Sequence, residues 1–375
     1  MKIKTITCHN VYNVGASLQA YALLTYLKGL GHEVEIIDYQ PGYLSDRHNI
    51  SYVPNEKYRN NIVLKYAYLL CKIPVRLKEL PKKNIFDKFH DENYTLTDKT
   101  YRNNEELKLN PPIADIYFAG SDQIWNTIFE NGKDPAFYLD FAPKESIKAS
   151  YAASFATEKV DDKYKSKVSK WIENLDYISV REKTGLDILE DMNIKRGQCV
   201  VDPVFLLDKS FWDSKCKDEN YNEDYLLVYD FENSSRIEEI SKYIAKKNNL
   251  KIWTVFKSKY ADKQLKNVGP LEFITYIKNA KCILSNSFHG TAFSIIFNKE
   301  FYVIKRNEDI NTRMQDLLDS INASERLIFN KEDLIKCKPL DYGYINNILE
   351  KNIQKSKEYI DFVIKESEKR GEYIG

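Results

Sequence analysis

The chain has 375 residues, more than one domain usually holds, so two domains are expected. Its 56 lysines and arginines stand against 55 aspartates and glutamates, which gives a net charge of +1 with the two signs interspersed. This balance excludes a whole-protein electrostatic attraction to nucleic acid, and no nucleic-acid partner is predicted. Only 13 of the 375 residues are glycine, which is about half of the average share of roughly 7%. This low glycine content excludes collagen-like and linker-rich chains.

The cysteines and the N-terminal segment indicate the compartment. The six cysteines are scattered, with no C-x-x-C pair and no histidine at metal-binding spacing. This is typical of a reducing compartment and predicts no metal site. The first ten residues lack the apolar segment of a signal peptide, and no uncharged apolar run approaches the roughly 20 residues that span a membrane. A cytoplasmic protein is therefore expected.

Short runs of β-branched and aromatic residues alternate with longer helical patterns from the first residues onward, which predicts an α/β fold. Lys2 to Thr7 is the first predicted strand. Ser17 fits the N-cap of a helix that continues to Leu30, and this helix is apolar on nearly all sides, so it is expected to be buried. A strand from Val34 to Ile37 completes a right-handed βαβ unit.

The segment from Asp38 to Lys99 lacks a regular pattern and is interpreted as an insertion at about residues 40–99. Between Glu56 and Lys88 it holds nine lysines or arginines and three acidic residues, interleaved with apolar and aromatic residues. This composition is compatible with two roles. One is peripheral contact of residues 56–88 with an anionic membrane, at its inner face. The other is a packed helical insertion whose lysines are solvated.

The alternation resumes after the insertion and runs through the second half of the chain. Strands are predicted at 116–119, 148–152, 177–180, 225–230, 251–255, 282–284 and 301–304, and helices at 162–175, from 182, at 236–248, 270–279 and 291–297, from about 311, and at 345–369. The pattern is read most simply as two α/β halves with a boundary near Gly197 to Phe211.

Four predicted strand ends carry unusual polar residues, and ligands of open parallel sheets bind at such ends. After the first strand, Gly15 would let backbone amides approach an anion next to Asn13 and Gln19, although a tight turn held by Asn13 explains these residues equally well. The loop after strand 116–119 combines amide, hydroxyl and carboxylate groups with an indole, which suits a sugar. Its candidate residues are Gly120, Ser121, Asp122, Gln123, Trp125 and Asn126.

The other two strand ends add groups that can carry positive charge. Arg181 follows strand 177–180, where its guanidinium can hold a carboxylate or phosphate with two hydrogen bonds, or form a simple ion pair with Glu182. His289 lies at a strand-to-helix junction, where anions bind, and imidazole exchanges protons near neutral pH. The small and hydroxyl residues around it are Ser285, Ser287, Gly290 and Thr291.

Together these segments resemble the polysaccharide pyruvyl transferase family over about residues 2–318. The resemblance rests on Asn13-Val-Gly15 with Leu18-Gln19, Gly120-Ser-Asp-Gln-Ile-Trp-Asn126, Ser179-Val-Arg-Glu182, Asp202-Pro-Val204, Ser287-Phe-His-Gly290 and Asn311-Thr-Arg313. It implies a fold like that of GT-B glycosyltransferases, with two Rossmann-like domains facing a cleft. Residues 1–197 would be the acceptor side and 198–375 the donor side, with the last helix crossing back to the N-terminal domain.

The resemblance also implies an activity. The enolpyruvyl group of phosphoenolpyruvate would be transferred to two hydroxyls of a sugar in a cell-surface polysaccharide or its precursor, which closes a pyruvate ketal and releases phosphate. Phosphoenolpyruvate would be a co-substrate with no further cofactor, and the acceptor would be a nucleotide-linked or lipid-linked sugar. By match to the family motifs, Arg181 and His289 would be the leading active-site residues. The resemblance also implies Asp122 as a catalytic group and Arg313 as a substrate-binding group.

The sequence departs from the family pattern at two positions. Some members have arginine where this chain has Ser287, and some have Gly-Asp where it has Gly15-Ala16. The missing cation weakens the case for phosphate binding, for which Arg313 or Lys305 would have to compensate. Two alternatives therefore stay open: a GT-B-like glycosyltransferase that uses a nucleotide sugar, and a catalytically silent glycan-binding protein.

Overall fold

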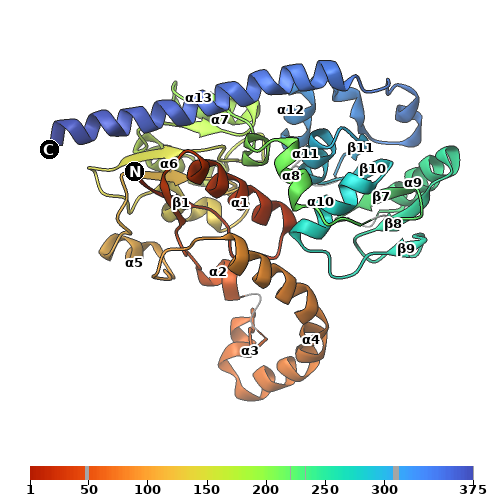
Figure 1. The fold of residues 1–375 in the computed structure, drawn as a ribbon. Helices are drawn as coiled ribbons and strands as arrows, with labels where there is room; N and C mark the ends of the chain where they lie inside the picture. Colours follow the sequence, from red (N-terminus) through yellow and green to blue (C-terminus); the bar gives the residue numbers. More distant parts are fainter. Residues whose placement is uncertain (47–49, 220, 233, 307–311, 375) are drawn as a thin grey trace.

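The computed structural model describes residues 1–46, 50–219, 221–232, 234–306 and 312–374. Two parallel β-sheets, one in each half of the chain, form the centres of two α/β domains (Figure 1). This arrangement confirms the predicted fold class. Within the described ranges, no helix combines the length and the apolarity needed to cross a bilayer.

The sheet of the N-terminal half has the strand order β2-β1-β3-β4, and its neighbouring strands are parallel. The strands are β1 (Lys2–Ile6), β2 (Glu33–Ile36), β3 (Ile116–Ala119) and β4 (Ile147–Ser150). Isolated bridges, Ala149 to Tyr177 and Ala153 to Val180, continue it to the parallel pair β5 (Ser179–Val180) and β6 (Gln198–Cys199). The strands therefore end along one edge, where the candidate site loops begin.

The helices of this half include α1 (Val14–Gly29), α2 (Gly42–Ser45), α5 (Asn104–Leu109), α6 (Asp162–Glu173) and α7 (Lys183–Asp191). Helix α1 begins earlier than the predicted cap Ser17, because Asn13 Oδ1 accepts hydrogen bonds from the amides of Gly15 and Ala16, at 2.9 and 3.1 Å. It is buried along most of its length, as its composition predicts, and it contacts helices of the second domain.

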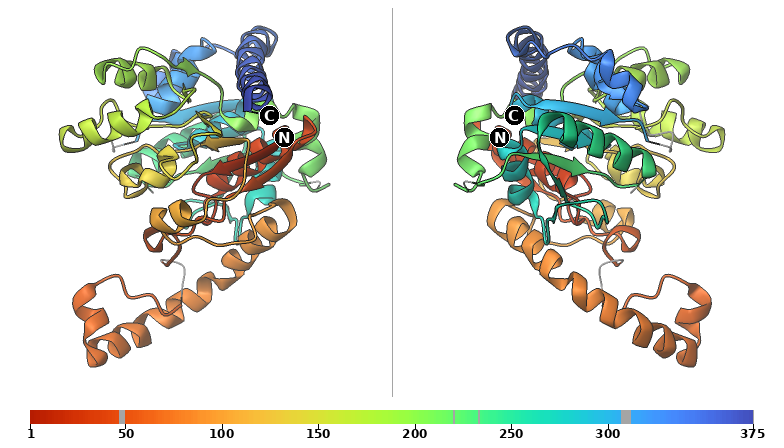
Figure 2. Two further views of the ribbon diagram at one scale, coloured as in Figure 1. Left: turned by 90° about the vertical axis from the view of Figure 1, so that its left-hand side faces the viewer. Right: turned by 90° about the vertical axis from the view of Figure 1, so that its right-hand side faces the viewer.

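The segment predicted to be irregular contains two helices. Helix α3 (Glu56–Asn60) is followed by α4 (Ile62–Asn93), which has 32 residues and continues through Pro74 and Pro81. Its first half projects away from the two domains (Figure 2). Its last turns return to the body, where Phe86 and Phe89 are buried in the core shared with the second domain. The insertion is thus helical, with one end packed and the other exposed.

The second domain contains a six-stranded parallel sheet of order β12-β11-β10-β7-β8-β9. Its strands are β7 (Tyr225–Tyr229), β8 (Lys251–Thr254), β9 (Lys263–Gln264), β10 (Cys282–Ser285), β11 (Glu300–Ile304) and β12 (Leu327–Ile328). Its helices include α8 (Lys209–Lys215), α9 (Ser235–Asn248), α10 (Pro270–Asn279), α11 (Phe288–Ile296) and α12 (Thr312–Ser320). The start of α12 predicted near Asn311 lies outside the described residues.

The last helix, α13 (Tyr342–Ile374), crosses from the second domain to the first, as the resemblance implies (Figure 1). Near its start Leu349 belongs to the core of the second domain, whereas Ile360 is buried with the strands of the first sheet. Tyr359 Oη donates a hydrogen bond to the carbonyl of Ser150 at 2.9 Å. In between, Ser356 Oγ accepts from the amide of Val201 at 2.9 Å, so α13 lies beside the other chain segment that connects the domains.

Candidate active site

The Arg181 side chain lies at the centre of a buried charged cluster. Its Nη1 donates to Asp202 Oδ2 at 2.7 Å and its Nε to Glu182 Oε1 at 3.2 Å. Its Nη2 is 3.7 Å from Asp122 Oδ1 and has no hydrogen-bond partner. The guanidinium carbon is 4.4 Å from the centre of the Phe288 ring, so a residue of the second domain covers it. Burial lowers the pKa of Arg181, but the surrounding carboxylates outweigh burial and raise it.

Arg313 brings a second cation to the same place from α12. Its Nη1 is 4.0 Å from Asp122 Oδ1, and its Nε is buried without a hydrogen-bond partner. Both of its terminal nitrogens donate to the side-chain oxygen of Gln123, at 3.1 and 2.9 Å, in the amide orientation that gives both the oxygen and the nitrogen of Gln123 a partner. Burial, and then repulsion from Arg181, lower the pKa of Arg313 to about 10. The cluster therefore holds two guanidinium groups close enough to disfavour each other's charge.

Asp122 reaches this cluster because of the backbone before it. Gly120 has φ of +134°, and a Cβ there would lie 2.0 Å from the Tyr151 carbonyl oxygen, so only glycine fits. Asp122 itself has φ of 72° and bridges to Ala153, three residues after the end of β4. The loop after β3 is thus pressed against the neighbouring strand end, which turns its carboxylate toward Arg181.

His289 lies in the first turn of α11, whose N-cap is Ser287. Its Nε2 is 3.6 Å from Asp202 Oδ2 and is buried without a hydrogen-bond partner. The other face of the imidazole rests on α1 of the first domain, since a Cβ at Gly15 would be 2.0 Å from His289 Nδ1. The two domains therefore close around this ring, and Gly15 leaves room for it.

Two carboxylates not predicted as site residues connect these groups. Asp202 lies between Arg181 and His289, and although burial raises its pKa, those two neighbours lower it to about 2. Glu182 is also buried, and burial raises its pKa despite the adjacent Arg181. Both residues are in the motifs quoted above. A further signal for Asp202 is its place three residues after the short strand β6, at the same edge as the other site residues.

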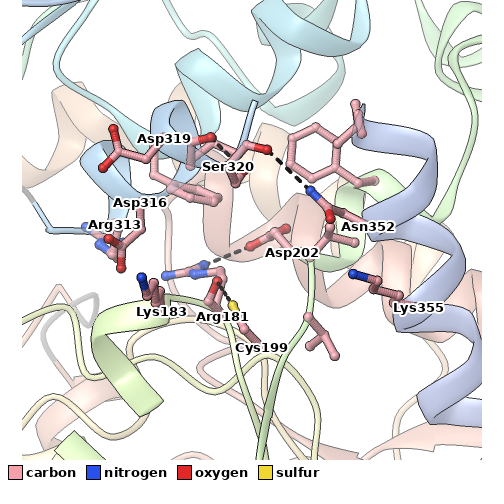
Figure 3. A pocket seen from close by; sticks show the side chains of 16 residues that line it. Arg181, Lys183, Cys199, Asp202, Arg313, Asp316, Asp319, Ser320, Asn352 and Lys355 are labelled. Carbon is pink, nitrogen blue, oxygen red and sulfur yellow. Dashed lines mark hydrogen bonds and ion pairs between the residues drawn. The ribbon is translucent and has the colours of Figure 1, made fainter. Parts of the chain in front are cut away.

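A cavity of about 450 Å³ opens beside the cluster, at the junction of the domains (Figure 3). Arg181 and Asp202 point toward each other at its base, and α13 forms one wall with Asn352 and Lys355. The other charged side chains that line it are Lys183, Arg313, Asp316 and Asp319. The Asp316 carboxylate accepts hydrogen bonds from the amide and hydroxyl of Thr184, at 2.9 and 2.7 Å, which joins α12 to the start of α7.

A model of the polysaccharide pyruvyl transferase family matches residues 13–308. The chain belongs to this family. The match covers the four candidate strand-end segments, whereas Arg313 lies beyond it. No curated protein sequence matches the chain.

The fold of this pyruvyl transferase family member is similar to that of GT-B enzymes of known structure. A UDP-N-acetylglucosamine 2-epimerase from Rickettsia bellii is 12% identical, with a TM-score of 0.50 over 97% of this chain and 98% of its own. A protein described as the same enzyme from Listeria monocytogenes is also 12% identical, with a TM-score of 0.50 over 94% of this chain and 90% of its own. At this identity the likeness establishes the fold alone, with two Rossmann-like domains.

Some predicted sugar-binding residues of this pyruvyl transferase family member are placed in the core. Trp125 is fully buried, its ring stacks on Tyr138 with centroids 5.6 Å apart, and its Nε1 donates to the Phe137 carbonyl at 3.1 Å. The indole therefore offers no open face to a sugar in this conformation. Asn126 is also fully buried, and its Oδ1 accepts from the amide of Ile128 at 3.0 Å.

Gln19 and Ser121 join the first two site loops rather than line a cavity. Both are fully buried, and Gln19 Oε1 accepts from the Ser121 amide at 3.2 Å while its Nε2 donates to Thr7 Oγ1 at 3.0 Å. Thr7 Oγ1 in turn donates to the Ser121 carbonyl at 2.9 Å. This network fixes the loop after β3 to the end of β1, so these side chains position Asp122 indirectly.

The residues around His289 mainly satisfy one another. Ser287 Oγ accepts from the Gly290 amide at 3.4 Å, and Thr291 Oγ1 donates to the Ser287 carbonyl at 3.1 Å. Ser285 Oγ accepts from the Ser287 amide at 3.0 Å and would be 2.4 Å from a Cβ at Gly290. The turn before α11 is therefore tightly built, and it fixes the position of the imidazole.

Beyond this cluster, a second polar cavity of about 220 Å³ lies where β1 and β2 end. It is lined by Asn10, Tyr12, Gln40, Ser45, Lys83, Asp87 and Arg102. Lys83 Nζ is 2.8 Å from Asp87 Oδ2, and Tyr12 Oη donates to Asp87 Oδ1 at 2.9 Å. Among the described residues, no group of three or more His, Cys, Asp or Glu side chains is arranged to hold a metal ion.

Proposed function

We propose that this protein transfers the enolpyruvyl group of phosphoenolpyruvate to two hydroxyls of a sugar, in a cell-surface polysaccharide or its precursor, forming a ketal and releasing phosphate. The observation that carries the proposal is a set of three nitrogens that lack a hydrogen-bond partner in one buried cluster: Arg181 Nη2, Arg313 Nε and His289 Nε2. Buried polar groups without partners are rare in folded proteins. The anionic oxygens of a bound ligand would supply the missing partners.

The donor carries about three negative charges, from its carboxylate and its phosphate. Arg181 and Arg313 would hold these groups, and Lys183 and Lys355 line the same cavity. Asp122 lies near both guanidinium groups, but burial and repulsion from Arg181 still lower the pKa of Arg313, so a further anion would be favoured there.

In the proposed reaction His289 is the general acid. As an imidazolium it would give its Nε2 proton to the methylene carbon of phosphoenolpyruvate, which leaves an oxocarbenium-like centre at the neighbouring carbon. A sugar hydroxyl adds to this centre and loses its proton to Asp122. A second hydroxyl then displaces phosphate and closes the ketal, and its proton restores the acid or leaves with phosphate. Asp202, 3.6 Å from Nε2, would stabilise the imidazolium.

The acceptor would bind on the N-terminal domain, in the cavity at the ends of β1 and β2. Its lining offers amides and hydroxyls for sugar hydroxyls, and Lys83 and Arg102 for a phosphate of a nucleotide-linked or lipid-linked sugar. Lys83→Ala and Arg102→Ala are then expected to raise KM for the acceptor more than KM for phosphoenolpyruvate.

Phosphate release tests the proposal directly. Phosphoenolpyruvate is incubated with the protein and a panel of nucleotide-linked and lipid-linked sugars, and the product is checked for a pyruvate ketal. With the acceptor found, His289→Ala and Arg181→Ala should each lower kcat about 10²-fold to 10⁴-fold. His32→Ala and Arg196→Ala, outside the cluster, are matched controls that should retain activity. Wild-type rates in both site variants would contradict the assigned roles.

Ligand-induced shifts in melting temperature separate the alternatives. Phosphoenolpyruvate should raise the melting temperature if the proposal holds, because a ligand that binds only the folded state stabilises it. Stabilisation by nucleoside diphosphates alone would instead favour a nucleotide-sugar glycosyltransferase. Sugar binding without any phosphate release would favour a silent glycan-binding protein, the reading that Ser287 in place of arginine supports.

A further inference from the structure

The exposed end of the insertion forms an arm, defined here as residues 57–78, which comprises α3 without its first residue, Glu56, and the first half of α4. It extends away from both domains (Figures 1 and 2). The arm is nevertheless well built: Asn61 caps α4, and Arg76 donates to the carbonyls of Ile50 and Tyr52, at 2.5 and 2.7 Å. Leu69 is buried within it. The arm is therefore an ordered helical surface rather than a loose loop.

One side of helix α4 in the arm is apolar. Each residue of an α-helix is rotated by about 100° from the one before it. In this projection five large apolar side chains of α4 fall within an arc of roughly 100°. Each is half exposed or more: Ile62 (70%), Val63 (72%), Tyr66 (61%), Leu70 (75%) and Leu77 (50%). A helix that packs on its own domain turns such a stripe inward, as α10 does with Phe273 and Ile274. No described part of the chain covers the stripe of the arm.

The charged side chains of the arm are all cationic. Residues 57–78 contain Lys57, Arg59, Lys65, Lys72, Arg76 and Lys78, and neither aspartate nor glutamate. The arm thus carries +6, and because the whole chain carries +1, the remaining residues carry −5. In the helical projection Lys65 and Lys72 lie on one side of the apolar stripe and Lys78 on the other.

We propose that the arm docks on an anionic lipid bilayer and lies in its interface. Apolar side chains of a helix enter the boundary between headgroups and acyl chains, and flanking lysines bind acidic headgroups, so the arm offers both signals that stable peripheral binding requires. The arm projects from both domains, so a bilayer can approach it (Figure 2). The docking does not depend on the proposed reaction, although it would bring lipid-linked sugars within reach.

Flotation with vesicles tests the proposal on the full chain. Wild-type protein should float with vesicles that contain acidic phospholipid, less so at high salt, and not with purely zwitterionic vesicles. The triple variants Ile62→Ser/Val63→Ser/Leu70→Ser and Lys57→Glu/Arg59→Glu/Lys65→Glu should each bind at least about tenfold more weakly. Circular dichroism and melting temperature establish that both variants are folded.

Matched controls carry the same kinds of change elsewhere on the surface. Leu109→Ser/Ile113→Ser removes two side chains that are 86% and 79% exposed outside the arm. Lys246→Glu/Lys247→Glu/Lys251→Glu changes the net charge by the same amount as the cationic arm variant. Both should float like wild type.

Three results would overturn the proposal. One is wild-type protein that stays unbound to acidic vesicles at low salt. Another is binding that the controls weaken as much as the arm variants do. The third is self-association in sedimentation that the arm variants abolish while no vesicle binding is seen, which would make the arm an interface between copies of the chain.

Discussion

The Arg181 guanidinium is fixed by two carboxylates and still has one nitrogen without a hydrogen-bond partner. Nη1 and Nε are bound to Asp202 and Glu182, so the side chain cannot turn away, while Nη2 is directed to the space near Asp122. A donor held in place before the ligand arrives loses little conformational freedom on binding. Arg181 is thus preorganised for an anion in a way that an exposed lysine is not.

Asp202 should be more important for stability than Glu182. Asp202→Asn removes the charge that compensates buried Arg181, and breaking such a pair is expected to lower the free energy of unfolding by about 3–5 kcal/mol. Glu182→Gln is the matched change and should lower it less, because burial already raises the pKa of Glu182 and so favours its neutral form. Urea unfolding at pH 7 measures both, and equal losses would argue against this distinction.

The loss of stability in Asp202→Asn should depend on pH. The pKa of Asp202 is lowered from 3.8 to about 2 in the folded protein, so its stabilising contribution is complete above about pH 4 and is lost as the pH falls toward 2. The stability difference between wild type and Asp202→Asn should therefore shrink between pH 4 and pH 2. A difference that stays constant across this window would show that Asp202 does not titrate as assigned.

Gly15 and Gly29 are two glycines of α1 with opposite expectations. A Cβ at Gly15 would meet the His289 ring at 2.0 Å, so Gly15→Ala should displace the imidazole or separate the domains, at a cost of about 1–3 kcal/mol and with a marked loss of activity. Nothing lies within 4 Å of a Cβ at Gly29, so Gly29→Ala should be neutral or stabilising by up to about 1 kcal/mol. Thermal melting and phosphate release measure both effects.

At the residue scale, sequence reasoning found the loops but could not tell which side chains face inward. Gln123 and Trp125 are two residues apart in one polar loop, yet Gln123 contacts Arg313 and Trp125 is stacked in the core. Periodicity is of no help in a loop, where each residue's direction depends on its own φ and ψ. Asp202 was missed as a site residue for the opposite reason. Its role is visible only when folding brings Arg181 and His289 next to it.

At the scale of elements, periodicity located most helices and strands, and the insertion was the exception. Helix α4 contains Pro74 and Pro81, which normally predict breaks. The helix continues through them, and its buried end is fixed by packing of Phe86 and Phe89 against residues of the second domain. Such tertiary contacts are not visible in a local pattern. The early start of α1 has a simpler cause, since Asn13 and Ser17 are both good caps and only one can act.

The last helix should contribute measurably to the stability of the first domain. Ile360 of α13 is fully buried against the first sheet, so Ile360→Ala is expected to lower the free energy of unfolding by about 2–5 kcal/mol. Asp361→Ala, the exposed neighbour on the same helix, should have little effect. Chemical denaturation of both variants measures this, and a loss in Ile360→Ala no larger than in the control would mean that α13 docks only loosely.

At the scale of the whole molecule, the alternation of strands and helices predicts two α/β halves, but it does not predict the strand order. The second sheet runs β12-β11-β10-β7-β8-β9, so β7 and β10 pair although more than fifty residues separate them. The order is decided by which strands can bury their faces together. The alternation does not predict the charged cluster around Arg181 either, because Arg181 belongs to the first domain and His289 and Arg313 to the second.

The route of the chain between the domains has a mechanical consequence. It passes from the first domain to the second after β6 and returns along α13, and the two passages are held side by side by the hydrogen bond between Val201 and Ser356. Two bodies connected along one line move apart by rotation about that line. The cavity beside Arg181 is lined by both passages, through Val201 and Asn352, and so lies near the axis. Domain rotation would change the shape of this cavity little. It would instead lengthen the distance between Gly15 of α1 and His289 of α11.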